Sequence, residues 1–340
     1  MTTLTETAYF GRKFINIGAI ALAIILVLRI VFGFATGLWQ KLFPPPPPPA
    51  NMAFGPLPYP LAQNNIATPS GTITYVLETV DGGFPETPHT LKVYFMPRLG
   101  ATFGSFDRMK VAAEKLGFTD VPLRAGPTIW RFTDKDNPLR TLDIDEISGN
   151  FRLMYNYVSD LSIFTSKNFT SSDQAINTAR DFFEHVSGLP STYYFKYDAG
   201  ALVSTTSLSN ADAVSVTFAR PDIDKMSVVS PDFRQGLVSA LISGSTDPKK
   251  TILEARFFTT DIDTQNWGTY PIVKAADAFE SLKSGKAIYA SLPLPMTSTI
   301  SIRKIYLAYL DPYPAQSYLQ PVWVFSDEKG FVAYIPGVLP

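Results

Sequence analysis

The sequence predicts an α+β protein in which antiparallel sheets are each packed by a helix, behind an N-terminal transmembrane helix and a proline stalk. Three observations lead to this expectation. A long apolar run lies near the N-terminus, an unbroken run of prolines follows it, and beyond residue 71 helical patterns alternate with strand-like runs. Apolar residues make up 46% of the chain and charged residues 17%, so the body is too apolar to be disordered.

The apolar run at 14–39 contains a single charged residue. Crossing a bilayer takes about 20 apolar residues, so we expect a transmembrane helix over 14–39. A cleaved signal peptide is the alternative, but the run is longer than the apolar core of such peptides, and no small-residue cleavage site follows it.

The charges that flank this run predict its orientation. Arg12 and Lys13 precede it, whereas Lys41 alone follows it. Because positive charge is retained on the cytoplasmic side, residues 1–13 are expected to form a cytoplasmic stub. The predicted location is the cell membrane, with a single pass and an extracytoplasmic C-terminal domain.

Arg29 lies inside the predicted span, where a charge costs at least about 2.5 kcal/mol on insertion scales. Two interpretations explain it. The long side chain can reach the headgroups of the outer leaflet, or it can pair with a polar residue on another helix, which would make Arg29 a membrane-assembly residue.

Residues 40–70 are expected to form a Pro-rich linker. The run Pro44–Pro49 favours the extended polyproline II conformation and gives a stiff spacer of roughly 19 Å. This spacer would hold the domain away from the bilayer.

The extracytoplasmic region, 71–340, shows one plan three times, with possible sub-units at 71–165, 166–265 and 266–340. In each, an amphipathic helix ends at a glycine and strands follow. The three predicted helices run from Ser105 to Gly117, from Ser171 to Gly188 and from Pro271 to Gly285. The main predicted strands are 127–132, 141–146, 151–157, 193–197, 213–218, 300–310, 321–327 and 330–337.

The C-terminal unit combines a helix reading AxxAFESLKSG with strands reading SIRKIYLAYLD and PVWVFSDEKGFVAYIPG. The residues that carry this pattern are Tyr306, Leu307, Tyr309, Pro321, Val322 and Trp323. The unit resembles the C-terminal part of the YycH and YycI family of membrane-anchored regulators, and more loosely the PepSY type of helix-plus-hairpin module. The resemblance implies an extracytoplasmic protein that modulates a sensor kinase or protease through protein contacts.

The sequence predicts no catalytic, cofactor-binding or metal-binding residue. Cysteine is absent and only two histidines occur, which leaves few groups that titrate near neutral pH. Paired carboxylates at 143–146, which include Asp143 and Asp145, and at 261–263, starting with Asp261, have a spacing suited to metal or acid/base chemistry. Alternation on a half-buried strand, where every second residue faces solvent, is the simpler explanation.

Other motifs point away from metal and nucleic acid. Residues 134–137 resemble the start of a calcium loop but lack its later glycine and glutamate, so we expect a hairpin turn there. The net charge of −1 argues against a nucleic-acid partner. Tyr309, Tyr313 and Tyr318 surround a proline-containing loop and are the best candidates for an exposed aromatic surface.

Three functions fit these observations. The first is an anchored interaction or regulatory protein with a partner in the membrane or envelope. The second is an envelope glycan-binding module or hydrolase that uses the strand carboxylates and exposed tyrosines. The third is a scaffold subunit of an envelope complex.

Substitution of Arg29 by leucine separates the two interpretations of that residue. If Arg29 pairs with another helix, Arg29→Leu should abolish co-purification of a complex from membranes. If the side chain only reaches the headgroups, the variant should keep the same complex at the same yield.

Overall fold

The structure is a computed structural model of the chain and divides into two compact units, 1–49 and 50–340. Its secondary structure confirms the α+β class. The residues that it describes are 18, 21–22, 24–34, 49–60, 73–165, 169, 171–187, 194–196, 211–233, 235–293 and 297–338.

In the N-terminal unit, residues 24–34 are helical. Within the described parts of the chain, no helix has both the length and the apolar character needed to span a bilayer. The rest of the expected span at 14–39, the stub at 1–13 and most of the proline run lie outside the described residues. The membrane anchor and its orientation therefore stay predictions.

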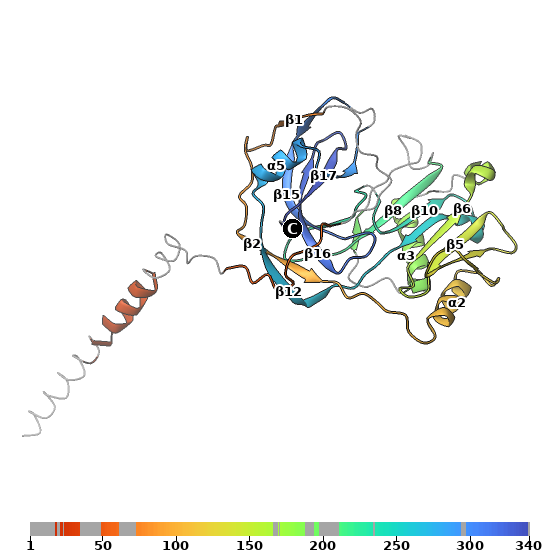
Figure 1. The fold of residues 1–340 in the computed structure, drawn as a ribbon, viewed down its shortest axis with the longest axis horizontal. Helices are drawn as coiled ribbons and strands as arrows, with labels where there is room; N and C mark the ends of the chain where they lie inside the picture. The colour runs from red at the N-terminus through yellow and green to blue at the C-terminus, as the bar shows by residue number, and fades with distance from the viewer. Residues whose placement is uncertain are drawn as a thin grey trace, which may run out of the picture. The chain divides into compact units, whose positions relative to one another are not determined.

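The larger unit contains an antiparallel sheet of eight strands (Figure 1). Its strands, in spatial order, are β3 (Leu123–Arg124), β4 (Ile129–Thr133), β5 (Arg140–Asp145), β6 (Phe151–Tyr155), β11 (Ile252–Phe257), β10 (Val238–Ser243), β8 (Ala213–Ala219) and β7 (Tyr194–Lys196).

This sheet is built from two successive units of helix plus four strands. Helix α2 (Ser105–Lys115) precedes β3 to β6, and helix α3 (Ser172–Ser187) precedes β7, β8, β10 and β11. The last strands of the two units, β6 and β11, pair antiparallel in the middle of the sheet. The plan predicted for 71–165 and 166–265 thus occurs twice, but the two sub-units share one sheet.

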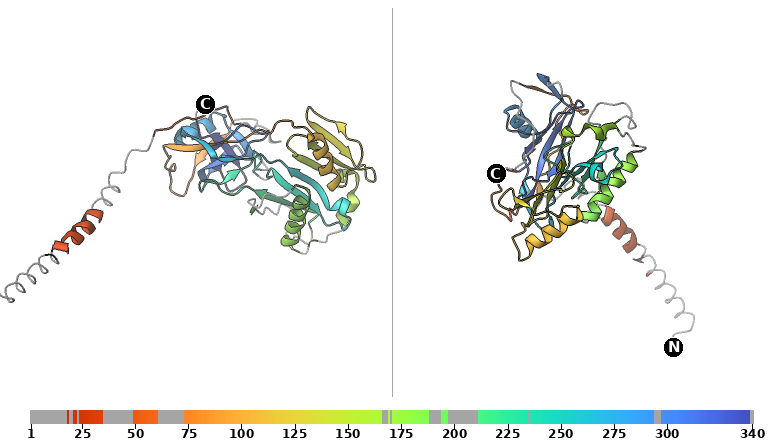
Figure 2. Two further views of the ribbon diagram at one scale, coloured as in Figure 1. Left: turned by 90° about the horizontal axis from the view of Figure 1, so that it is seen from below. Right: turned by 90° about the vertical axis from the view of Figure 1, so that its right-hand side faces the viewer.

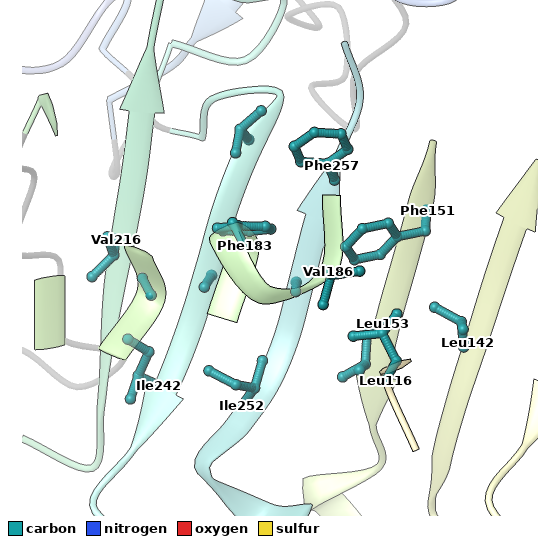
Figure 3. Close-up of a cluster of buried hydrophobic side chains, with 14 of the residues drawn as sticks. Leu116, Leu142, Phe151, Leu153, Phe183, Val186, Val216, Ile242, Ile252 and Phe257 are labelled. Atoms are coloured by element: carbon teal, nitrogen blue, oxygen red, sulfur yellow. The ribbon is translucent and has the colours of Figure 1, made fainter. Parts of the chain in front are cut away.

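Both helices lie on the same face of this sheet and contribute to one hydrophobic core (Figure 2, Figure 3). Alternate strand residues point toward the helices, as period-two packing requires. Phe183 of α3 sits at the centre, where its ring contacts those of Phe151 and Phe257. The rings of Phe151 and Phe257 stack across the β6–β11 pair with centroids 5.5 Å apart. The core therefore spans the boundary between the two units.

The helix boundaries are confirmed in part. Gly117 ends α2 with a left-handed φ of 83°, and Ser171 Oγ accepts a hydrogen bond from the backbone N–H of Gln174 at the start of α3. Ser105 is the first residue of α2 and Gly104 is its cap, so the predicted N-cap is wrong by one residue.

The predicted start of the third helix is also wrong. Pro271 is the last residue of strand β12 (Asp263–Pro271), and helix α5 (Ala275–Lys283) begins four positions later. Proline fits the end of a strand as well as the first turn of a helix, so the residue type alone did not separate the two.

A second sheet, of seven strands, accounts for most of the remaining chain. Helix α5 packs on it, with Phe279 and Leu282 beside Trp323 and Phe325. Its strands are β12, β2 (Thr90–Phe95), β16 (Tyr318–Ser326), β15 (Lys304–Leu310), β9 (Val228–Val229), β17 (Val332–Pro336) and β13 (Ile288–Ser291). A separate parallel pair joins β1 (Thr74–Leu77) to β14 (Thr299–Ile302).

The predicted sub-unit at 266–340 is therefore not self-contained. Strands β2 and β9 come from the ranges assigned to the first and second sub-units, yet both pair with strands of the second sheet. Strand β13 pairs with β17 and not with β15, so this part does not repeat the strand order of the two earlier units.

Residues 50–60, which we name the docked segment, pack on the second sheet although the sequence predicted a linker there. Leu57 is only 5% exposed, and the Phe54 ring contacts that of Tyr318 at 5.0 Å. The Tyr270 hydroxyl donates to the carbonyl of Gly55 and accepts from the backbone N–H of Phe54. A Cβ at position 268, where the chain has glycine, would lie 3.0 Å from the backbone nitrogen of Ala53. The folded domain therefore begins at residue 50.

Truncation of Leu57 tests whether the docked segment belongs to the folded domain. Leu57→Ala should lower the free energy of unfolding by about 2 to 4 kcal/mol, because a buried side chain is replaced by a cavity. Leu123→Ala is the matched control, since Leu123 is 73% exposed. Equal midpoints in urea for the two variants would contradict the packing of this segment.

Candidate functional site

The candidate site is a groove with a volume of about 760 Å³, which we name the inter-sheet groove. It lies within the larger unit and is formed by segments that are far apart in the sequence. Its lining residues come from α2, the end of α3, the β5–β6 turn, the end of β11 and the loops at 97–99 and 314–315.

One wall of the groove is apolar. Ala112 of α2, Val186 of α3 and Phe257 of β11 line it, and these helices are fixed by the shared core. Leu99 stands at the rim with 61% of its surface exposed. An exposed leucine above an apolar wall gives the groove hydrophobic area for a ligand to bury.

The polar side of the groove is built around Asp145. Its carboxylate accepts hydrogen bonds from the backbone N–H groups of Ile147 and Ser148 at 3.0 and 2.7 Å, and from the hydroxyls of Ser148 and Thr128. Burial alone would raise the pKa of Asp145, but these hydrogen bonds outweigh it and lower the pKa below its usual range. Asp145 is therefore ionised at neutral pH and holds the β5–β6 turn.

Two further contacts join segments that line the groove. The side-chain amide of Asn150 donates to the carbonyl of Thr259 and accepts from the backbone N–H of the same residue, at 3.1 and 3.0 Å. Arg98 Nη2 donates to the carbonyl of Ala315 at 3.2 Å. The groove is thus held by hydrogen bonds between its own segments.

The structure separates the carboxylates that the sequence singled out. Asp145 and Asp261 both line the groove. Asp143 lies outside it, on the sheet face opposite the helices, where both of its oxygens accept from Arg131 at 2.6 Å. Solvent-facing alternation, the simpler of the two sequence interpretations, accounts for Asp143.

The motif at 134–137 forms the predicted hairpin turn. Asp134 accepts from the backbone N–H groups of Asp136 and Asn137, and Lys249 Nζ lies 3.0 Å from Asp134 and 2.9 Å from Asp136. The lysine ammonium thus bridges the two carboxylates, and Arg140 Nη1 also pairs with Asp134 at 3.2 Å. Among the described residues, no group of three or more histidine or acidic side chains could hold a metal ion.

The predicted exposed aromatic surface is wrong for Tyr309. This residue is 0% exposed, and its hydroxyl donates to the carbonyl of Lys92 at 3.0 Å, because β15 lies between β16 and β9. Tyr313 and Tyr318 are half-buried and pack on Phe258 and on Phe54, respectively.

Arg29 lies within the helical stretch 24–34 and is exposed. Whether it pairs with another helix remains a prediction. The groove residues Arg98, Leu99, Asn150 and Thr259 were missed by sequence reasoning, because no local pattern relates segments that meet only in the folded chain.

Comparison with known proteins does not identify a family. No family model matches the chain, and no curated protein sequence matches it significantly. An uncharacterized protein from Eubacterium rectale ATCC 33656 matches in structure with 10% identity and a TM-score of 0.38, over 74% of this chain and 84% of that one. The C-terminal domain of Bacillus megaterium YpeB matches with 13% identity and a TM-score of 0.32, over 71% of this chain and 95% of that one. Similarities at this level establish neither a family nor a function, and the resemblance to YycH and YycI stays a prediction.

The hydrogen bonds to Asp145 predict a pH-dependent contribution to stability. Because the pKa of Asp145 is lowered in the folded state, its ionised form stabilises the fold at pH values above the usual carboxyl pKa. This stabilisation is lost as the pH falls through the lower pKa of the folded state. Asp145→Asn should therefore lower the free energy of unfolding by about 1 to 2 kcal/mol at neutral pH and by less below about pH 4.

Urea unfolding at both pH values measures this difference. Asp261→Asn makes the same change on the rim of the groove and serves as the control. A stability difference for Asp145→Asn that is the same at both pH values would contradict the assignment.

Proposed function

We propose that this chain is a membrane-anchored extracytoplasmic interaction protein that regulates a partner in the cell envelope by binding a segment of that partner in the inter-sheet groove. The observation that carries this proposal is the groove's construction. It combines exposed apolar area at Leu99 with charged groups of both signs at Arg98 and Asp261. Binding sites for flexible ligands commonly pair apolar area with a few polar groups that set orientation.

The chemistry of the groove favours binding over catalysis. A general acid or base works best when its pKa lies near the operating pH. Asp145 has the opposite property, since its pKa is lowered and its oxygens are occupied by the turn that it holds. Asp145, the residue best placed to act as an acid, therefore has a structural role.

A glycan-binding module or hydrolase is less well supported. Such a site would place exposed aromatic rings beside the carboxylates. Among the described residues that line the groove, the only aromatic one is Phe257, which is 7% exposed and packed in the core.

The membrane location and the regulatory role rest on the sequence. The apolar run at 14–39 supports an anchor, and the resemblance to YycH and YycI suggests a sensor kinase or protease as the partner. A scaffold role would instead depend on Arg29 and a second transmembrane helix.

Site-specific photo-crosslinking tests the proposal in native membranes. A photoreactive amino acid at Leu99 should give a discrete adduct with one protein, whereas the same amino acid at Val80, which is 97% exposed and outside the groove, should not. Ala112→Arg fills the groove and should reduce the Leu99 adduct at least about tenfold, equivalent to about 1.4 kcal/mol of binding free energy.

Val111→Arg is the matched control, because Val111 is exposed on α2 and does not line the groove. It should leave the adduct unchanged. Equal labelling from Leu99 and Val80, or an adduct that survives Ala112→Arg, would refute binding in the groove.

A further inference from the structure

The face of the eight-stranded sheet opposite the helices carries a row of polar residues in direct register across six strands. We name it the cross-strand row. Each residue is the register partner of the next, and neighbouring positions in such rows interact directly. From β4 to β8 the row reads Arg131, Asp143, Arg152, Arg256, Ser239 and Thr217.

Positive charge exceeds negative charge at the centre of this row. Arg152 and Arg256 are register partners, and Glu254, which precedes Arg256 by two residues on the same face, is shared between them. Its Oε1 accepts from Arg152 Nη2 and from Arg256 Nε, each at 3.0 Å. With the Arg131–Asp143 pair included, three guanidinium groups face two carboxylates, while a third carboxylate on this face, that of Asp145, is held by the β5–β6 turn.

Two buried polar atoms in the same place are unsatisfied. Arg152 Nε and Ser239 Oγ find no hydrogen-bond partner among the described groups, and Ser239 is only 2% exposed. A buried polar atom without a partner costs about 1 to 3 kcal/mol, so native structures seldom keep one without a role. The two atoms lie on either side of Arg256 in the register.

We propose that the cross-strand row binds a carboxylate-bearing segment of a protein partner, with the guanidinium groups of Arg152 and Arg256 as its main ligands. A guanidinium presents paired donors whose geometry matches a carboxylate. A ligand carboxylate would neutralise the surplus charge and bind the accessible part of the Arg152 side chain, which is 38% exposed. This surface is separate from the inter-sheet groove, so its test does not depend on that site.

The surroundings of the row favour a peptide over a small oxyanion. Two apolar side chains, Ile129 and Met154, lie on the same face of the sheet as the row, because their register partners are Asp145 and Glu254. Ile129 and Met154 are each 40% exposed. Apolar side chains beside the arginines offer contact area to a polypeptide that an isolated ion cannot use.

A binding titration tests the proposal on the full chain in a mild detergent. A fluorescently labelled polyglutamate peptide with blocked ends should bind saturably, and more weakly as salt rises. Arg256→Gln should weaken binding at least about tenfold, because a charge-assisted bidentate contact is lost. Glu254→Gln should tighten binding, because it frees both guanidinium groups from their shared carboxylate.

The Arg303–Glu78 ion pair supplies matched controls, since it lies outside the row and joins groups 3.0 Å apart. Arg303→Gln and Glu78→Gln make the same changes in net charge and should leave the affinity unchanged. Unfolding would not produce the tighter peptide binding expected of Glu254→Gln. This variant therefore still tests the proposal if Arg256→Gln folds poorly.

Three results would overturn the proposal. They are the absence of saturable binding, equal effects of the row variants and their controls, and displacement of the peptide by inorganic phosphate at matched ionic strength. The last result would mark a site for small oxyanions.

Discussion

The antiparallel pairing of β6 with β11 is the interaction on which the rest of the larger sheet depends. It joins two units of a helix and four strands whose buried residues form one hydrophobic core. Across this pair, Phe151 stacks on Phe257 on one face. On the other face, the same register places Arg152 beside Arg256. One pairing therefore creates both the shared core and the surplus of positive charge.

A buried ion pair links this sheet to the second one. Arg220, just after β8, donates through Nε to Asp311, just after β15, and through Nη2 to the carbonyl of Thr260 at 2.6 Å. Burial raises the pKa of Asp311, and the Arg220 guanidinium opposes that effect. Breaking such a pair leaves an uncompensated buried charge, which costs about 3 to 5 kcal/mol. The inter-sheet groove lies beside this link, since Thr260 also lines it.

Local sequence patterns predicted those features of the fold that depend on residues close together in the sequence. Glycine at position 117 ends a helix because it adopts a left-handed conformation, and alternation along 151–155 marks a half-buried strand. No local sequence pattern predicts the pairing of β6 with β11, because either strand could equally have been an edge strand of its own sheet. The docked segment was missed because its prolines and asparagine suggest a linker, whereas Leu57 is buried by a sheet distant in sequence. The cross-strand row likewise arises only once register is fixed.

Cysteine crosslinking between β6 and β11 tests their pairing most directly, because the native chain has no cysteine. Met154 and Glu254 are register partners, whereas Met154 and Ser239 lie two strands apart and are offset by two residues along the strands, so their Cα atoms are separated by more than roughly 9 to 10 Å. A disulfide needs Cα atoms within about 7 Å. If β6 and β11 pair as described, mild oxidation should crosslink Met154→Cys with Glu254→Cys and should not crosslink Met154→Cys with Ser239→Cys. Equal crosslinking of the two pairs, or none in the first while both thiols remain reactive, would contradict this pairing.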